Sequence, residues 1–155
     1  MKLAGQKVDA PKDQVVVIPR DTGNLVFKAT AVLDYTDFEK LCPKPLVPVK
    51  VFPGGRRQEN VEDEGYKKAL NEWAAHRIQF MVIKSLEATP ELVWEQVKLD
   101  DPETWVKYEA ELKEGLSEVE VGKIFECVTT ACGLNQDQIE EATRNFLATP
   151  EGTQK

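Results

Sequence analysis

Long apolar runs and cysteine are scarce in this chain of 155 residues, and each shortage excludes a class of protein. No apolar run approaches the ~20 residues that a membrane-spanning helix needs, so we expect no membrane segment. Cys42, Cys127 and Cys132 are an odd and sparse set, which is not a disulfide framework. Residues 1–13 lack the hydrophobic core of a signal peptide, so the expected location is the cytoplasm.

Side chains suited to catalysis or metal binding are also few. His76 is the only histidine, and a tuned general base needs a partner that the sequence does not show, so we interpret it as a half-buried packing residue. Cys127 and Cys132 do not have the spacing of zinc ligands and are interpreted as core thiols. Cys42 precedes a proline and has no nearby base. We therefore expect no enzyme activity, no cofactor and no metal.

Positive charge is in deficit as well. The net charge is −7 and the pI is near 4.9, which disfavours a nucleic-acid partner. An apolar fraction of 41% and a charged fraction of 30% are typical of a soluble globular protein. The length predicts a single domain over residues 1–150, followed by a frayed tail at 151–155.

The first third of the chain has the pattern of a β-hairpin. Residues 15–19 are β-branched, residues 24–32 alternate in polarity, and the turn-forming residues 20–23 separate them. Next, Asp34 is a candidate N-cap, and Leu33 and Phe38 have the spacing of a hydrophobic staple. These residues predict a short helix that ends before Pro43.

What the sequence does contain, and unusually, is a proline-rich apolar segment over residues 43–60, which we call the strap. Its prolines exclude a helix and make it a poor central strand, and Gly54-Gly55 is interpreted as a flexible hinge. The strap is too apolar for a solvated linker, so it either packs on its own domain or is offered to a partner. Its candidate partner-binding residues are Leu46, Val47, Val49, Val51 and Phe52.

The remaining two thirds are mainly helical by pattern. Apolar spacing predicts a helix over 62–86, residues 92–99 fit a strand or an extended segment, and a cap at Asp101 predicts a helix over 101–115. Two capping devices then predict helices that begin after Ser117 and after Asn135. The expected fold is α+β, with the N-terminal hairpin packed on these helices. The expected core residues are Trp73, Phe80, Ile124, Phe125, Val128 and Phe146.

Seven segments together resemble the tail assembly chaperones of long-tailed, siphovirus-like bacteriophages. They are MKLAGQKV, VVVIPR, AVLDYTDFEKLCPKP, GYKKALNEWA, IKSLEAT, LDDPETWVKYEAEL and GLNQDQIEEATRNFL. The resemblance is one of overall pattern and contains no catalytic signature.

The resemblance implies a non-enzymatic assembly factor in the cytoplasm of an infected bacterium. Its partner would be the phage tape measure protein, which such chaperones keep soluble while tail tube protein polymerises around it. The alternative is a structural minor tail or completion protein that stays in the virion. A hydrolase or nuclease is a third reading, disfavoured by the missing base and metal spacing.

Overall fold

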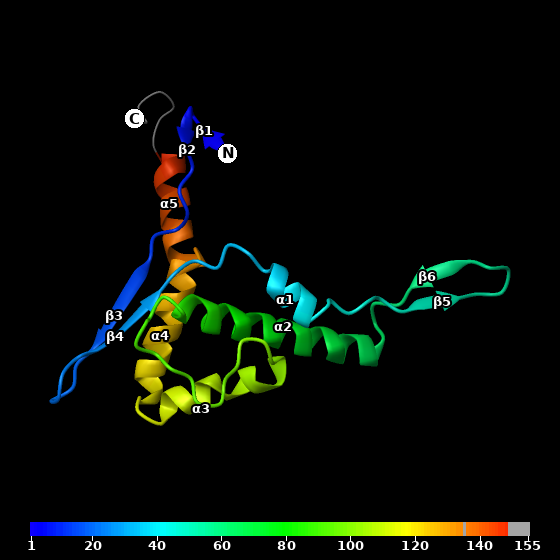
Figure 1. Cartoon of the computed structure of the whole chain (residues 1–155). Helices are drawn as coiled ribbons and strands as arrows, with labels where there is room; N and C mark the ends of the chain where they lie inside the picture. Colours follow the sequence, from blue (N-terminus) through cyan, green and yellow to red (C-terminus); the bar gives the residue numbers. More distant parts are fainter. Residues whose placement is uncertain (135, 149–155) are drawn as a thin grey trace.

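The computed structural model describes residues 1–134 and 136–148 and confirms the α+β fold (Figure 1). The described strands form three two-stranded antiparallel sheets, β1 (Lys2–Leu3) with β2 (Gln6–Lys7), β3 (Gln14–Ile18) with β4 (Leu25–Ala29), and β5 (Val49–Val51) with β6 (Arg57–Glu59). The described helices are α1 (Thr36–Leu41), α2 (Glu64–Leu86), the 3-10 helix η1 (Pro102–Lys107), α3 (Tyr108–Lys113), α4 (Glu118–Ala131) and α5 (Gln136–Ala148).

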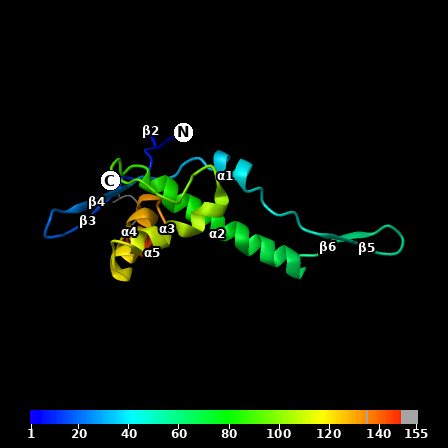
Figure 2. The same ribbon diagram turned by 60° about the horizontal axis from the view of Figure 1, so that its bottom comes forward.

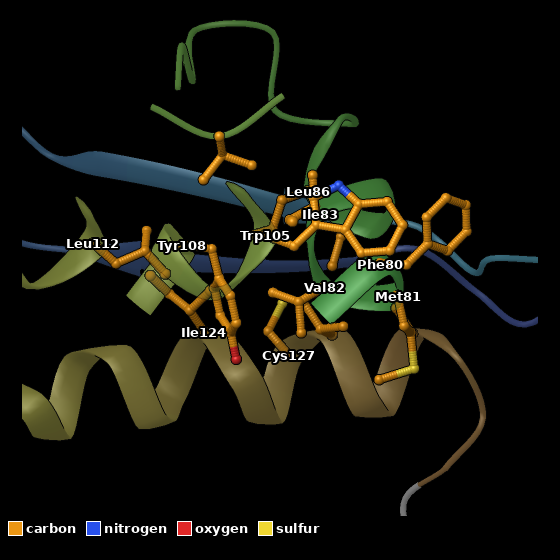
Figure 3. Packing of buried hydrophobic residues seen from close by; sticks show 14 of the residues in the cluster. Phe80, Met81, Val82, Ile83, Leu86, Trp105, Tyr108, Leu112, Ile124 and Cys127 are labelled. Carbon is orange, nitrogen blue, oxygen red and sulfur yellow. The ribbon is translucent and has the colours of Figure 1, made fainter. Parts of the chain in front are cut away.

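The core is built around the C-terminal half of α2. Residues 80–83, together with Ser85 and Leu86, are buried, so this part of the helix is covered on every side except at Lys84, which is half-buried. It packs against β4, α4 and η1. Figure 3 shows Trp105 of η1 beside Phe80, with Cys127 of α4 on the other side near Val82. The expectation that Phe80, Ile124 and Val128 are core residues is confirmed.

The β3–β4 hairpin forms as the alternation predicts. Val16 pairs with Phe27, and Ile18 and Ala29 are buried against the helical body. The outer edge of β4 is bound to the end of α2, because the Thr89 hydroxyl both accepts from the Lys28 amide at 2.8 Å and donates to its carbonyl at 2.9 Å. The hairpin is therefore a layer of the core.

The helix starts follow the capping signals. Ser117 and Glu120 form a capping box at α4, and the Asp63 carboxylate accepts from the Tyr66 amide at the start of α2. Asp101 caps η1 as predicted, but the single helix expected over 101–115 is η1 followed by α3. The predicted cap at Asn135 and the tail at 151–155 lie outside the described residues.

Three local predictions need correction. The helix α1 starts one residue later than predicted, so its N-cap is Tyr35, although the Asp34 carboxylate still accepts from the amide and hydroxyl of Thr36. Leu33 is exposed and forms no staple. Residues 92–99 are not a strand, because the Glu111 carboxylate accepts from amides in this segment at 2.6 and 3.0 Å in place of a neighbouring strand. The segment is irregular and is held by α3.

Two expected core aromatics are exposed. Phe125 keeps 40% of its surface accessible because α4 buries Ile124, Cys127 and Val128, and Phe125 lies about 100° around the helix from Ile124. Phe146 lies on α5, which extends away from the body in Figure 1, and no described residue of α5 is buried. Trp73 is partly buried at the margin of the core.

Candidate functional site

The strap forms a hairpin. Val49 pairs with Glu59 and Val51 with Arg57, although the prolines predicted that this segment would make a poor central strand. Pro48 lies at the base, where its carbonyl accepts from the Asn60 amide at 2.7 Å and no amide of its own is needed. The prolines therefore border the strands and do not interrupt them.

The glycine pair forms the turn of this hairpin. Gly54 and Gly55 have φ angles of 93° and 81°, a region that other residues rarely adopt. The turn is closed by the Phe52 amide, which donates to the carbonyl of Arg56 at 2.8 Å, and by the Gly55 amide, which donates back to the Phe52 carbonyl at 3.1 Å. The glycines thus belong to a defined turn and not to the flexible hinge that we expected.

The two faces of the β5–β6 hairpin differ in character. Val49 and Val51 lie on one face with Arg57 and Glu59, their pairing partners on β6. The opposite face holds Phe52, whose ring is covered by the Arg56 guanidinium at 4.9 Å from its centroid. The first face is the more open one, with Val49 and Val51 exposed by 53% and 67%.

The strap divides into two parts at about residue 48. Its first part follows α2, since the Trp73 indole donates to the Cys42 carbonyl at 3.0 Å and the Lys44 ammonium lies over the same ring. Leu46 in this part is 90% exposed, whereas Val47 is half-buried. Beyond residue 48 the hairpin extends away from the body, as Figures 1 and 2 both show. The first part therefore packs on its own domain, and the second is free to be offered to a partner.

The strap is also basic, although the protein is acidic. It contains Lys44, Lys50, Arg56 and Arg57 against Glu59 alone, within a chain of net charge −7. A surface with exposed valines and an excess of positive charge fits a partner that is apolar and acidic.

A second feature of the surface is a groove between α3 and α4, which we call the α3–α4 groove. Its volume is about 240 Å³, and its floor and walls include Val82, Leu112, Val121 and Phe125. Its charged lining residues are Glu109, Lys113 and Glu118.

Tyr108 contributes its largely buried ring to the same groove. Burial raises the pKa of Tyr108 to about 12, with a further contribution from the adjacent Glu109 carboxylate. The hydroxyl is therefore neutral at physiological pH and serves as a polar group in an apolar wall. The groove was not predicted from the sequence, because Phe125 was assigned to the core. The buried stripe of α4 runs through Ile124, Cys127 and Ala131, and its spacing would have placed Phe125 outside the core.

The side chains considered for chemistry are dispersed. The His76 ring stands edge-on to Trp105 with 6.0 Å between centroids, and it is half-buried. Cys42, Cys127 and Cys132 are free thiols, and burial raises the pKa of Cys42 and of Cys127, which disfavours the nucleophilic thiolate. Within residues 1–134 and 136–148 no three His, Cys, Asp or Glu side chains are grouped to hold a metal ion.

Among the helices that the structure describes, none combines the length and the apolar character needed to cross a membrane. The chain matches no family model, no curated protein and no solved structure.

Proposed function

We propose that this protein is a non-enzymatic binding protein whose β5–β6 hairpin docks on another protein. The observation that carries the proposal is the position of Val49 and Val51, which are exposed on an arm away from the body. Exposed apolar side chains on a projecting element are typical of interaction sites. None of the buried core residues lies on this arm, so it is available for a partner.

The backbone of β5 offers a second means of recognition. Hydrogen-bonded pairs alternate along an antiparallel ladder, and the pairs Pro48–Asn60 and Phe52–Arg56 bond inward. The amides and carbonyls of Val49 and Val51 therefore point outward along the edge of the hairpin. An extended segment of a partner can add there as a further strand.

The partner that we propose follows the resemblance to phage tail assembly chaperones. In that role the protein holds the tape measure protein in the host cytoplasm while the tail tube forms. An acidic body with a basic apolar arm suits a protein that must stay dispersed and still bind a long partner. The alternative, a minor tail or completion protein, would use the same arm to reach a neighbouring virion subunit.

The test is co-purification of the tape measure protein with a variant in which Val49, Val51 and Phe52 are changed to serine. We expect the melting temperature to be nearly unchanged and co-purification to be lost. The matched control is Val15→Ser with Val17→Ser, since these two valines of β3 are 57% and 51% exposed on another hairpin. Retained capture by the strap variant, or equal loss by the control, would contradict the proposal.

Purified virions separate the two candidate roles. A tail assembly chaperone is expected to be absent from them by mass spectrometry, and a structural subunit is expected to be present in stoichiometric amount.

A further inference from the structure

We propose that the β5–β6 hairpin of one copy docks in the α3–α4 groove of a second copy. The hairpin and the groove are two places where apolar side chains and an excess of one charge coincide. This self-association would occur when no tail partner is bound.

The charges of the two surfaces are complementary. The hairpin, residues 49–59, carries Lys50, Arg56 and Arg57 against Glu59, an excess of two positive charges, whereas residues 108–126 contain six glutamates against two lysines. Glu120 of that set is paired with Arg20, and Glu111 binds backbone amides. Glu109, Lys113 and Glu118 line the groove itself, and the Lys113 ammonium lies 4.0 Å from the Glu109 carboxylate. Glu118 is therefore the carboxylate at the rim of the apolar floor that the basic arm meets.

The apolar parts also correspond. The groove exposes Phe125 beside Val121, and the hairpin presents Val49 and Val51 on one face. Arg57 and Glu59 lie on that same face, directly opposite Val51 and Val49. When the valines cover Phe125 and Val121, Arg57 is the basic residue placed to meet Glu118.

The contact has to form between copies. Figures 1 and 2 both show the hairpin at the far end of α2 from α4 and extending away from it, so it does not reach the groove of its own chain. Reciprocal docking of two copies closes a dimer, and one-way docking builds a chain of copies. In either assembly the exposed valines of a docked hairpin are covered by the groove of another copy. A tail protein that binds the hairpin would displace that groove.

Sedimentation across a concentration series tests the proposal. We expect a mass that rises above the 17.5 kDa of one chain. We also expect the association to weaken when salt is raised from about 0.1 M to about 1 M, which shortens the Debye length from about 10 Å to about 3 Å. A mass of 17.5 kDa at every concentration overturns the proposal.

A charge swap identifies the two surfaces. Arg57→Glu and Glu118→Lys should each weaken self-association by about tenfold or more, because each places like charges together. An equal mixture of the two variants should associate again, since the two substituted side chains are opposite in charge and the native Arg57 of one variant still meets the native Glu118 of the other. Lys7→Glu, on the exposed β2 strand, is the matched control and should associate as the unchanged protein does.

Circular dichroism of each variant shows whether it is folded. If folded single variants associate normally, or if the mixture stays monomeric, the hairpin does not dock in this groove. Glu118→Lys leaves the hairpin intact, so this variant should still capture the tape measure protein. If Glu118→Lys loses self-association but still captures the tape measure protein, the contact between copies is distinct from the proposed function. The proposed function itself fails only if the unchanged hairpin does not capture the tape measure protein.

Discussion

Phe80 is buried among the rings of Phe38, Trp105 and Tyr35, whereas Phe125 borders the α3–α4 groove. We expect Phe80→Ala to lower the free energy of unfolding by about 3–5 kcal/mol, the usual cost of a large cavity. Phe125→Ala should cost about 1 kcal/mol, because much of this side chain is already in water. Urea unfolding of both variants measures the difference, and equal losses would show that Phe125 is a core residue after all.

Arg20 and Glu120 join the turn after β3 to the start of α4 with an ion pair of 2.7 Å. The hydrogen bond from Arg20, followed by one from the Ser117 amide, lowers the pKa of Glu120 from 4.5 to about 2. A carboxylate with a lowered pKa stabilises the fold above its unfolded pKa, and this contribution is lost as the pH falls from about 4.5 toward about 2.

We expect Glu120→Gln to be less stable than the unchanged protein at pH 7, with the difference shrinking as the pH falls below about 4.5. Glutamine keeps an oxygen that can accept from the Ser117 amide, so the substitution removes mainly the charge. Urea unfolding at several pH values measures both proteins. A stability difference that is the same at pH 7 and at about pH 2 would exclude the ion pair as its cause.

At the scale of elements, α4 depends on its capping box. The Ser117 hydroxyl accepts from the Glu120 amide at 3.2 Å, and the Glu120 carboxylate accepts from the Ser117 amide at 2.9 Å. Ser117→Ala should cost about 0.5–2 kcal/mol, the range for a lost N-cap, as measured by urea unfolding. Thr129→Ala is a suitable control, because its hydroxyl bonds to the Glu126 carbonyl within α4 and leaves the start of the helix unchanged. An equal loss in both variants would count against the cap.

Elements that are set by neighbouring residues were predictable from the sequence. The β3–β4 turn, the Ser117 cap and the Asp101 cap each involve residues within a few positions of one another. The exposure of α5 was not predictable, since an apolar stripe shows which face of a helix can be buried and not whether anything covers it. Burial of Phe80 was predicted, whereas burial of Met81 and Val82 on the other sides of the same helix was missed for the same reason.

The strap illustrates the limit of composition as a guide to the site. Its apolar residues were identified, and Val49 and Val51 are exposed as a binding role requires. The pairing of the strap was not predicted, because the number of prolines was considered and not their positions. The prolines lie at the base and in the turn of the hairpin, where they leave the hydrogen-bonded ladder intact. The stripe of α4 could have placed Phe125 outside the core, but the groove itself depends on how α3 packs beside α4, which no local pattern encodes.

For the whole molecule, the projecting arm should be the first part to open to a protease. Lys50, Arg56 and Arg57 are exposed on the β5–β6 hairpin, whereas Lys84 lies half-buried within α2. We expect trypsin to cleave first in the strap and to leave two fragments that remain associated through the core. Mass spectrometry under native and denaturing conditions detects this, and early cleavage inside α2 would contradict the arrangement.

Ser85 and Thr89, at the C-terminal end of α2, affect how the protein aggregates at high concentration. The Thr89 hydroxyl bonds to both the backbone amide and the backbone carbonyl of Lys28. The Ser85 hydroxyl donates to the Thr30 carbonyl at 2.7 Å, and the Ser85 backbone carbonyl accepts from the Thr30 amide at 3.2 Å. A bare strand edge is a template for amyloid-like stacking, and the bonds made by Thr89 and Ser85 cover the C-terminal end of the β4 edge. Within the described part of the chain, no such seal covers the outward groups of Val49 and Val51. Crowding should therefore drive stacking through the β5–β6 hairpin before it does so through β4.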